Sequence, residues 1–203
     1  MKHLVKHLRE HHAHEIMSKS YRNCHVRGLD SILLLDSPEH RIRLFVARPE
    51  HELWKNTPRT LGSLAAHPHH CDITIEMTHG TLTNYTYRKQ ENGRFVGYSY
   101  RSAILDGAGS FRYHHLVLPV AFEGATTHDP RCQPLVLAAH TIHSVQVAKG
   151  RSAAWFVYEG HEDQHYAALS YSDQNLEQTS FEGLYESMTL AQIMEALELA
   201  QVL

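Results

Sequence analysis

Short runs of apolar residues, many of them alternating with polar ones, fill the chain from about residue 29 to about residue 160. They are rich in β-branched and aromatic residues and are separated by turn-forming stretches such as Ser37–Pro38 and Asn92–Gly93. A period of two places the apolar side chains on one face of a strand, and turns at this spacing are typical of antiparallel sheets. The pattern predicts an all-β core, an antiparallel sandwich or barrel of many short strands.

Helical periodicity occurs at both ends of the chain. Residues 2–19 carry apolar residues at roughly helical spacing with charged residues between them. Residues 189–202 do the same behind Thr189, which is a suitable helix cap. Because no repeat or linker-like stretch interrupts the chain, we expect a single domain over residues 1–203, with a helix at 2–19, a barrel at about 29–170 and a second helix at 189–202.

The composition narrows the classes of function. A net charge of −3 without a Lys/Arg-rich run argues against nucleic-acid binding. No apolar run is long enough to span a bilayer, and residues 1–15 lack the apolar core of a secretory signal, so no membrane partner and a cytoplasmic location are expected. The three cysteines, Cys24, Cys71 and Cys132, form no CxxC pair and indicate neither a disulfide framework nor a thiolate zinc site.

Histidine is the residue in excess, at 19 of 203. At this frequency about two HxH pairs arise by chance, which limits what one pair can prove. The chain has two, His12/His14 and His67/His69. The first pair belongs to the N-terminal segment, whose histidines are best read as a solvated helix face.

The second pair opens the segment HPHHCDITIEMTHG, residues 67–80. Residues two apart on a strand share a face, so His67 and His69 are expected to point the same way. The apolar run Ile73–Met77 is expected to continue that strand to a turn at Gly80.

A further candidate ligand stands in the segment HSVQVAKGRSAAWFVYEG, residues 143–160. It predicts a strand that begins at His143, a turn at Lys149–Gly150 and another strand through Trp155. A single histidine facing an HxH pair across a barrel would give a three-histidine site with positions open for substrate, water or oxygen. Imidazole suits iron, nickel, copper and zinc, so the ligands do not select the metal.

Together the two segments resemble the signature motifs of the cupin superfamily, in particular little-characterised HxHxxD-type bacterial cupins and thiol-dioxygenase-like proteins. The resemblance covers roughly residues 60–160 and is carried by nine positions: His67, His69, Asp72, Gly80, His143, Val145, Gly150, Arg151 and Trp155. It implies a cupin-type antiparallel β-barrel (jelly roll) with one divalent metal held by His67, His69 and His143. It also implies a homodimer as one form of assembly.

Three local alternatives remain open. Asp72 is either a fourth ligand or a partner that orients a ligand histidine. The set His70, Asp72 and His143 would instead make the two-histidine, one-carboxylate triad of ferrous oxygenases. His140 is an alternative to His143, although the strand pattern that follows favours His143.

Polar side chains on the barrel strands are candidates for the pocket. Arg41 and Arg43 share one face of a strand, as do Tyr98 and Tyr100 on another. An arginine would bind an acidic group of a substrate through two hydrogen bonds, and Arg43 and Arg112 are the candidates for that role. Asp72, Tyr98 and Tyr100 are the candidates for catalytic roles at the metal.

Three functions fit these features. The favoured one is a mononuclear ferrous oxygenase or dioxygenase that acts on a small polar molecule. The second is an isomerase, lyase or hydrolase that uses Zn²⁺, Mn²⁺ or Ni²⁺ as a Lewis acid. The third is a non-catalytic cupin that binds a metal or a small ligand.

Overall fold

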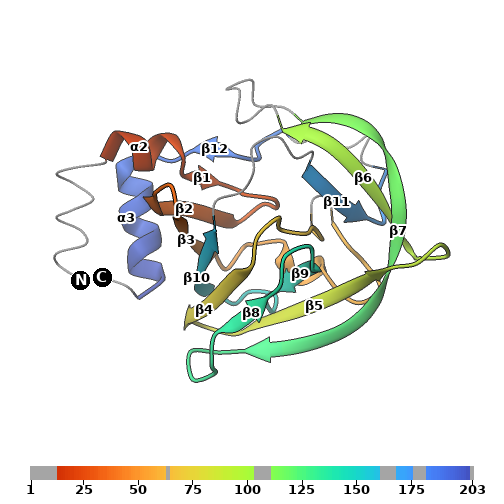
Figure 1. The fold of residues 1–203 in the computed structure, drawn as a ribbon. Helices are drawn as coiled ribbons and strands as arrows, with labels where there is room; N and C mark the ends of the chain where they lie inside the picture. The colour runs from red at the N-terminus through yellow and green to blue at the C-terminus, as the bar shows by residue number, and fades with distance from the viewer. Residues whose placement is uncertain (1–12, 63–64, 103–110, 161–167, 176–181, 202–203) are drawn as a thin grey trace.

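Two antiparallel sheets make up most of the molecule, and two helices lie against the outer side of one of them (Figure 1). The computed structural model describes residues 13–62, 65–102, 111–160, 168–175 and 182–201. Within these ranges the predicted antiparallel β fold class, with a helix near each end, is confirmed. The part of the predicted N-terminal helix before residue 13 lies outside the described residues.

The first sheet has seven strands in the order β12-β1-β2-β3-β10-β4-β8. Its central strands pair antiparallel, with Trp155 opposite Phe45 on one side and Met77 on the other, and the register between β10 and β4 shifts between Ala154 and Trp155. The strands are β1 (Tyr21–Arg22), β2 (Leu29–Asp36), β3 (His40–Ala47), β4 (Ile73–His79), β8 (Leu135–Leu137), β10 (Ala153–Gly160) and β12 (Glu186–Ser187).

The second sheet has five strands in the order β11-β6-β7-β5-β9 and is strongly curled (Figure 1). Residues 66 and 67 bridge its two edge strands, because Ala66 pairs with Tyr171 and His67 pairs with His143. The strands are β5 (Leu82–Lys89), β6 (Phe95–Ser102), β7 (Phe111–His128), β9 (Ile142–Gln146) and β11 (Ala168–Ser172), and a short 3-10 helix, η1 (Leu53–Lys55), precedes them.

The helices cover the outer face of the seven-stranded sheet. Ile16 of α2 (Ala13–Ser18) and Ile193 of α3 (Leu190–Leu199) pack in one buried cluster with Leu44 and Val46 of β3. Thr189 caps α3 as expected, since its hydroxyl accepts a hydrogen bond from the backbone N–H of Gln192 in a capping box.

Alternation along β3 separates this helix-covered face from the interior between the sheets. Leu44 and Val46 face the helices, whereas Arg41, Arg43 and Phe45 lie on the opposite face and line a cavity. The strand therefore delivers two charged side chains and one aromatic ring to the interior.

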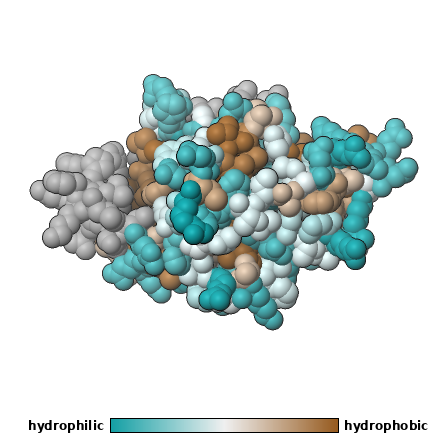
Figure 2. All heavy atoms as spheres, turned by 90° about the horizontal axis from the view of Figure 1, so that it is seen from below, coloured by the Kyte–Doolittle hydropathy of each residue, from teal (hydrophilic) through white to brown (hydrophobic). Residues whose placement is uncertain are grey.

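The surface view shows polar side chains spread over one face, with apolar ones between them in separate patches (Figure 2). Among the described residues, no helix is both long and apolar enough to cross a membrane.

Candidate metal centre

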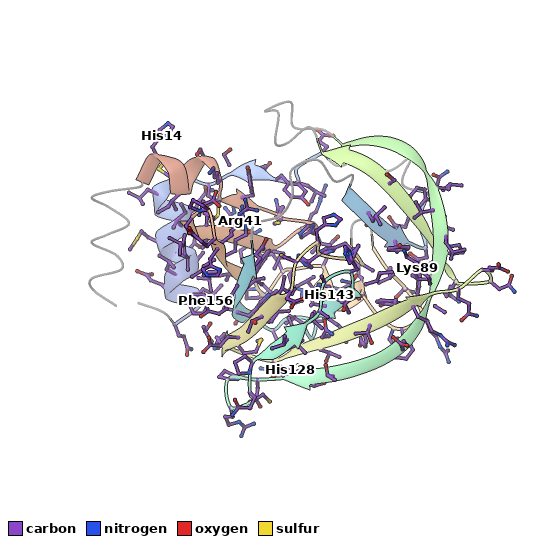
Figure 3. All side chains as sticks on the ribbon, viewed as in Figure 1. His14, Arg41, Lys89, His128, His143 and Phe156 are labelled. Atoms are coloured by element: carbon purple, nitrogen blue, oxygen red, sulfur yellow. The ribbon has the colours of Figure 1, made fainter. Side chains whose placement is uncertain are left out.

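Three histidines meet inside the molecule. One ring nitrogen from each of His67, His69 and His143 lies within 4.8 Å of the others. The ring centroids are 5.0 Å apart for His67 and His69, 5.4 Å for His67 and His143, and 5.3 Å for His69 and His143. His143 lies in the interior between the two sheets (Figure 3). The structure thus brings together the three histidines that the sequence selected.

Backbone hydrogen bonds fix the segments that carry these rings. The N–H of His67 donates to the carbonyl of His143 at 3.0 Å, and the N–H of His143 donates back to the carbonyl of His67 at 3.1 Å. The carbonyl of His69, two residues after His67, accepts a hydrogen bond from the backbone N–H of His140 at 2.7 Å. The two segments run side by side, so the histidine pair is placed by β9.

The expectation that His67 and His69 lie on the strand through Ile73 is wrong. Strand β4 begins at Ile73 and belongs to the seven-stranded sheet, whereas the HxH segment is extended chain at the edge of the other sheet. The pair reaches the same site through a single bridge to β9.

His143 is prepared as a ligand by its partner Asn84. Its Nδ1 lies 2.8 Å from the side-chain oxygen of Asn84, which accepts a hydrogen bond, so Nδ1 carries the proton. The lone pair is then on Nε2, which is buried and has no hydrogen-bond partner among the described residues. Burial, with the neighbouring His69 and His25, holds the pKa of His143 well below 6.5. The ring is neutral at neutral pH, as metal binding requires.

A fourth histidine, His25, adjoins the cluster. Its ring stacks on His67 with centroids 4.8 Å apart, and its Nδ1 lies 2.8 Å from the hydroxyl of Tyr185. Both His25 (φ 65°) and Tyr185 (φ 56°) have left-handed backbone, which is uncommon for residues other than glycine. Burial, with smaller contributions from His69 and Arg43, lowers the pKa of His25 to about 4.

The sequence analysis missed this pair. His25 stands in a turn-rich stretch between Asn23 and Gly28, and Tyr185 lies 160 residues further along. No spacing or periodicity connects the two positions, so only the abundance of histidine pointed toward His25.

A cavity of about 250 Å³ opens beside the cluster. Its described lining includes His67 and His69 on one side and Arg41, Arg43 and Glu159 on another. The rings of His25, Tyr185 and Phe45 also line it. A metal bound by the three histidines would therefore have space beside it for a small ligand.

Asp72, His70 and His140 do not belong to the three-histidine group. Asp72 is exposed, and its carboxylate accepts a hydrogen bond from the backbone N–H of Ala139 at 2.7 Å. His70 lines the cavity and its ring meets that of the exposed His140, with centroids 5.8 Å apart. In this arrangement Asp72 supports the loop before β9, and the set of His70, Asp72 and His143 is not assembled.

The remaining candidates are divided between two places. Arg43 lines the cavity beside the histidines. Tyr98 lines a different cavity, and its hydroxyl donates to the carbonyl of Gln174 at 3.2 Å. The side chains of Tyr100 and Arg112 lie outside the described part of the structure.

The histidines of the N-terminal segment are also mostly outside the described residues. His14 is the first of them within the described part, and it is exposed on α2, away from the cluster (Figure 3).

Fold and site together define an antiparallel β-barrel protein with an internal three-histidine centre. No protein-family model matches the chain. No curated protein matches it either.

Several solved structures are similar to part of the chain. One is a cupin superfamily protein from Desulfitobacterium hafniense, at 12% identity and a TM-score of 0.36, covering 66% of this chain and 78% of that one. A second is hydroquinone 1,2-dioxygenase from Sphingomonas sp. TTNP3, at 12% identity and a TM-score of 0.37, covering 64% and 65%. A third is hydroxypropylphosphonic acid epoxidase from S. wedmorenis, at 12% identity and a TM-score of 0.37, covering 70% and 56%. This chain matches less than two thirds of the length of either enzyme.

Proposed function

We propose that this protein is a mononuclear non-haem metal enzyme with ferrous iron, an oxygenase or dioxygenase that acts on a small polar molecule. The observation that carries the proposal is the convergence of three imidazole nitrogens within 4.8 Å beside a cavity. Three ligands on one side of an ion leave its other positions open for substrate and oxygen.

The residues present fit such an ion. The donors are three imidazoles, which iron accepts, and Nε2 of His143 is buried without a hydrogen-bond partner among the described residues. A buried acceptor of this kind costs free energy, which binding a cation would recover. Asn84 holds the His143 ring in the tautomer that presents this lone pair.

Ferrous iron held by His67, His69 and His143 would supply the redox chemistry that an oxygenase reaction needs. The surrounding chain would bind and orient the substrate in the cavity, whose volume of about 250 Å³ limits it to a small molecule. Tyr185, hydrogen-bonded to His25, places a hydroxyl group at the cavity wall, where it can hold or pass a proton.

The second candidate is Lewis-acid chemistry with Zn²⁺, Mn²⁺ or Ni²⁺, because three imidazoles can also bind these ions. Isomerases and hydrolases of this kind use an acid–base group close to the metal. Glu159 is the acidic residue among the described ones that line the cavity, and its carboxylate lies 3.9 Å from the Arg41 guanidinium. Glu159, Tyr185 and His25 are the acid–base groups that this candidate would use, and oxygen uptake distinguishes it from the oxygenase.

The deciding experiment is metal analysis by mass spectrometry on untagged protein purified without oxygen, together with oxygen-uptake assays. We expect about one iron per chain, lost in His143→Ala, and oxygen consumption in a screen of small polar compounds. One zinc, manganese or nickel per chain without oxygen uptake would move the assignment to Lewis-acid chemistry. Full iron retention in both His67→Ala and His143→Ala would refute the site.

A further inference from the structure

Arg43 brings a positive charge to the cavity and forms no ion pair with a described carboxylate. Its Nη1 donates to the backbone carbonyl of Lys19 at 3.0 Å and to the hydroxyl of Ser31 at 3.1 Å, and both acceptors are neutral. No described residue accepts a hydrogen bond from its Nε or Nη2, and no described carboxylate forms an ion pair with it. Nε and Nη2 form the edge of the guanidinium that binds a carboxylate through two parallel hydrogen bonds.

Arg41, two residues away on the same face of β3, is different. Its Nε donates to the carboxylate of Asp36 at 3.2 Å, and its Nη1 lies 3.9 Å from Glu159. Its charge is therefore already balanced. Arg41 serves as an internal comparison for Arg43, because it lines the same cavity from the same strand.

Among the described residues that line the cavity, positive charge exceeds negative charge. Its described lining contains two arginines and one acidic residue, Glu159, which faces Arg41. A divalent ion held by three neutral histidines adds two further positive charges. A concave site lined by excess positive charge attracts ligands of negative charge.

From these observations we propose that Arg43 is the subsite for the carboxylate of a small organic acid, which is the substrate class of the centre. The inference rests on the proposed function, since it places the acid beside the metal. The cavity volume of about 250 Å³ equals roughly eight waters of liquid, which limits the acid to a short one. Phe45 and Leu169 offer an apolar wall for its carbon chain.

Propionate and its neutral isostere propionamide are probes that test this subsite without any mutation. Titration calorimetry on the metal-loaded wild-type protein should show propionate binding at least about tenfold more tightly than propionamide, because a charge-assisted pair replaces a neutral one. Equal affinity for the two compounds would overturn the proposal. Tighter binding of inorganic phosphate than of propionate would overturn the assignment to carboxylic acids.

Two variants assign the binding to the arginine. Arg43→Gln should weaken propionate binding at least about tenfold. Arg43→Lys keeps the charge but lacks the two-donor edge, so its propionate affinity should lie between those of Arg43→Gln and wild type. Arg41→Gln, the matched control, should stay within about threefold of wild type, because its charge is already engaged. Thermal unfolding of each variant shows whether a loss comes from the subsite or from the fold.

The same titration on metal-free protein separates this inference from the proposed function. If metal analysis shows that the protein binds no metal, and propionate still binds in a way that depends on Arg43, the subsite is supported and the proposed metal enzyme is refuted. Propionate binding that is lost in His143→Ala but unchanged in Arg43→Gln would mean that the acid contacts only the metal, and the subsite would be refuted.

Discussion

The hydrogen bond from His143 to Asn84 decides which nitrogen of this histidine faces its neighbours. Replacing Asn84 with alanine removes the acceptor for Nδ1–H, so the ring loses both its tautomer and its orientation. We expect metal affinity to fall by about 10–100-fold, which is typical for a residue that orients a ligand. Competition with a chelator, measured on Co²⁺-loaded protein, would give the two affinities.

Tyr85→Phe is the control for that change. Tyr85 follows Asn84 on β5 and links the same two strands, since its hydroxyl donates to Gln146 of β9 at 2.8 Å. Its loss weakens the strand pair without touching His143, so metal affinity should stay within about threefold of wild type. A similar loss of metal affinity in both variants would mean that the affinity depends on the contact between β5 and β9 and not on the tautomer of His143.

The low pKa of His25 makes the metal-free protein sensitive to acid. The unfolded chain takes up a proton near pH 6.5, whereas burial lowers the pKa of folded His25 to about 4. Between these values the unfolded state binds more protons, so stability is present above pH 6.5 and is lost as pH falls toward 4. The loss has an upper limit of about 3 kcal/mol for this group, and His143 adds to it in the same direction.

Urea unfolding at pH 7 and pH 4.5 would measure this loss. His25→Asn removes the titrating ring and tolerates the left-handed backbone at this position, so the difference between the two pH values should shrink by roughly 2 kcal/mol. His40→Asn, a change of an exposed histidine outside the cluster, is the control and should keep the full difference. An unchanged difference in His25→Asn would contradict the prediction.

At the scale of elements, the turn after β4 depends on a glycine. Gly80 has a φ of 73°, and a Cβ added there would lie 2.4 Å from the backbone oxygen of Ser152. Gly80→Ala should therefore lower the free energy of unfolding by about 2–4 kcal/mol through strain and steric clash. Gly150 has nearly the same φ, 72°, but no atom within 4 Å of such a Cβ.

Gly150→Ala separates these two causes. It carries the backbone strain alone and should cost about 1 kcal/mol. Denaturant unfolding of both variants gives the comparison, and equal losses would mean that the contact with Ser152 is relieved by a small shift of the chain.

The strands themselves could be read from the sequence because alternation is local. The expected strands around Ile73–Met77 and from His143 are present as β4 and β9, and the alternation that placed Arg41 and Arg43 on one face is found in β3. The HxH segment was misplaced because its partner, β9, lies far along the chain, and nothing local distinguishes a bridge from a strand. His25 and Tyr185 escaped for the same reason: their contact exists only in three dimensions.

At the scale of the whole molecule, the candidate metal centre lies where the curled sheet closes. The bridges from Ala66 to Tyr171 and from His67 to His143 join β11 and β9, the two edges of that sheet. The ligands come from the bridging segment and from one of the edges it joins. A metal ion there would tie the closure together, so occupancy and global stability should be linked.

This link gives a direct prediction for unfolding. An ion that binds only the folded state adds about 2.7 kcal/mol at a concentration 100 times its dissociation constant, or roughly 5–10 °C for a chain of this size. Thermal unfolding of metal-free protein, without oxygen and with or without Fe²⁺ or Co²⁺, measures the shift. His143→Ala should abolish it, whereas His14→Ala, a change on the exposed face of α2, should retain it. A shift that survives in His143→Ala would place the bound ion at other histidines of the chain, and closure of the sheet would then be independent of metal.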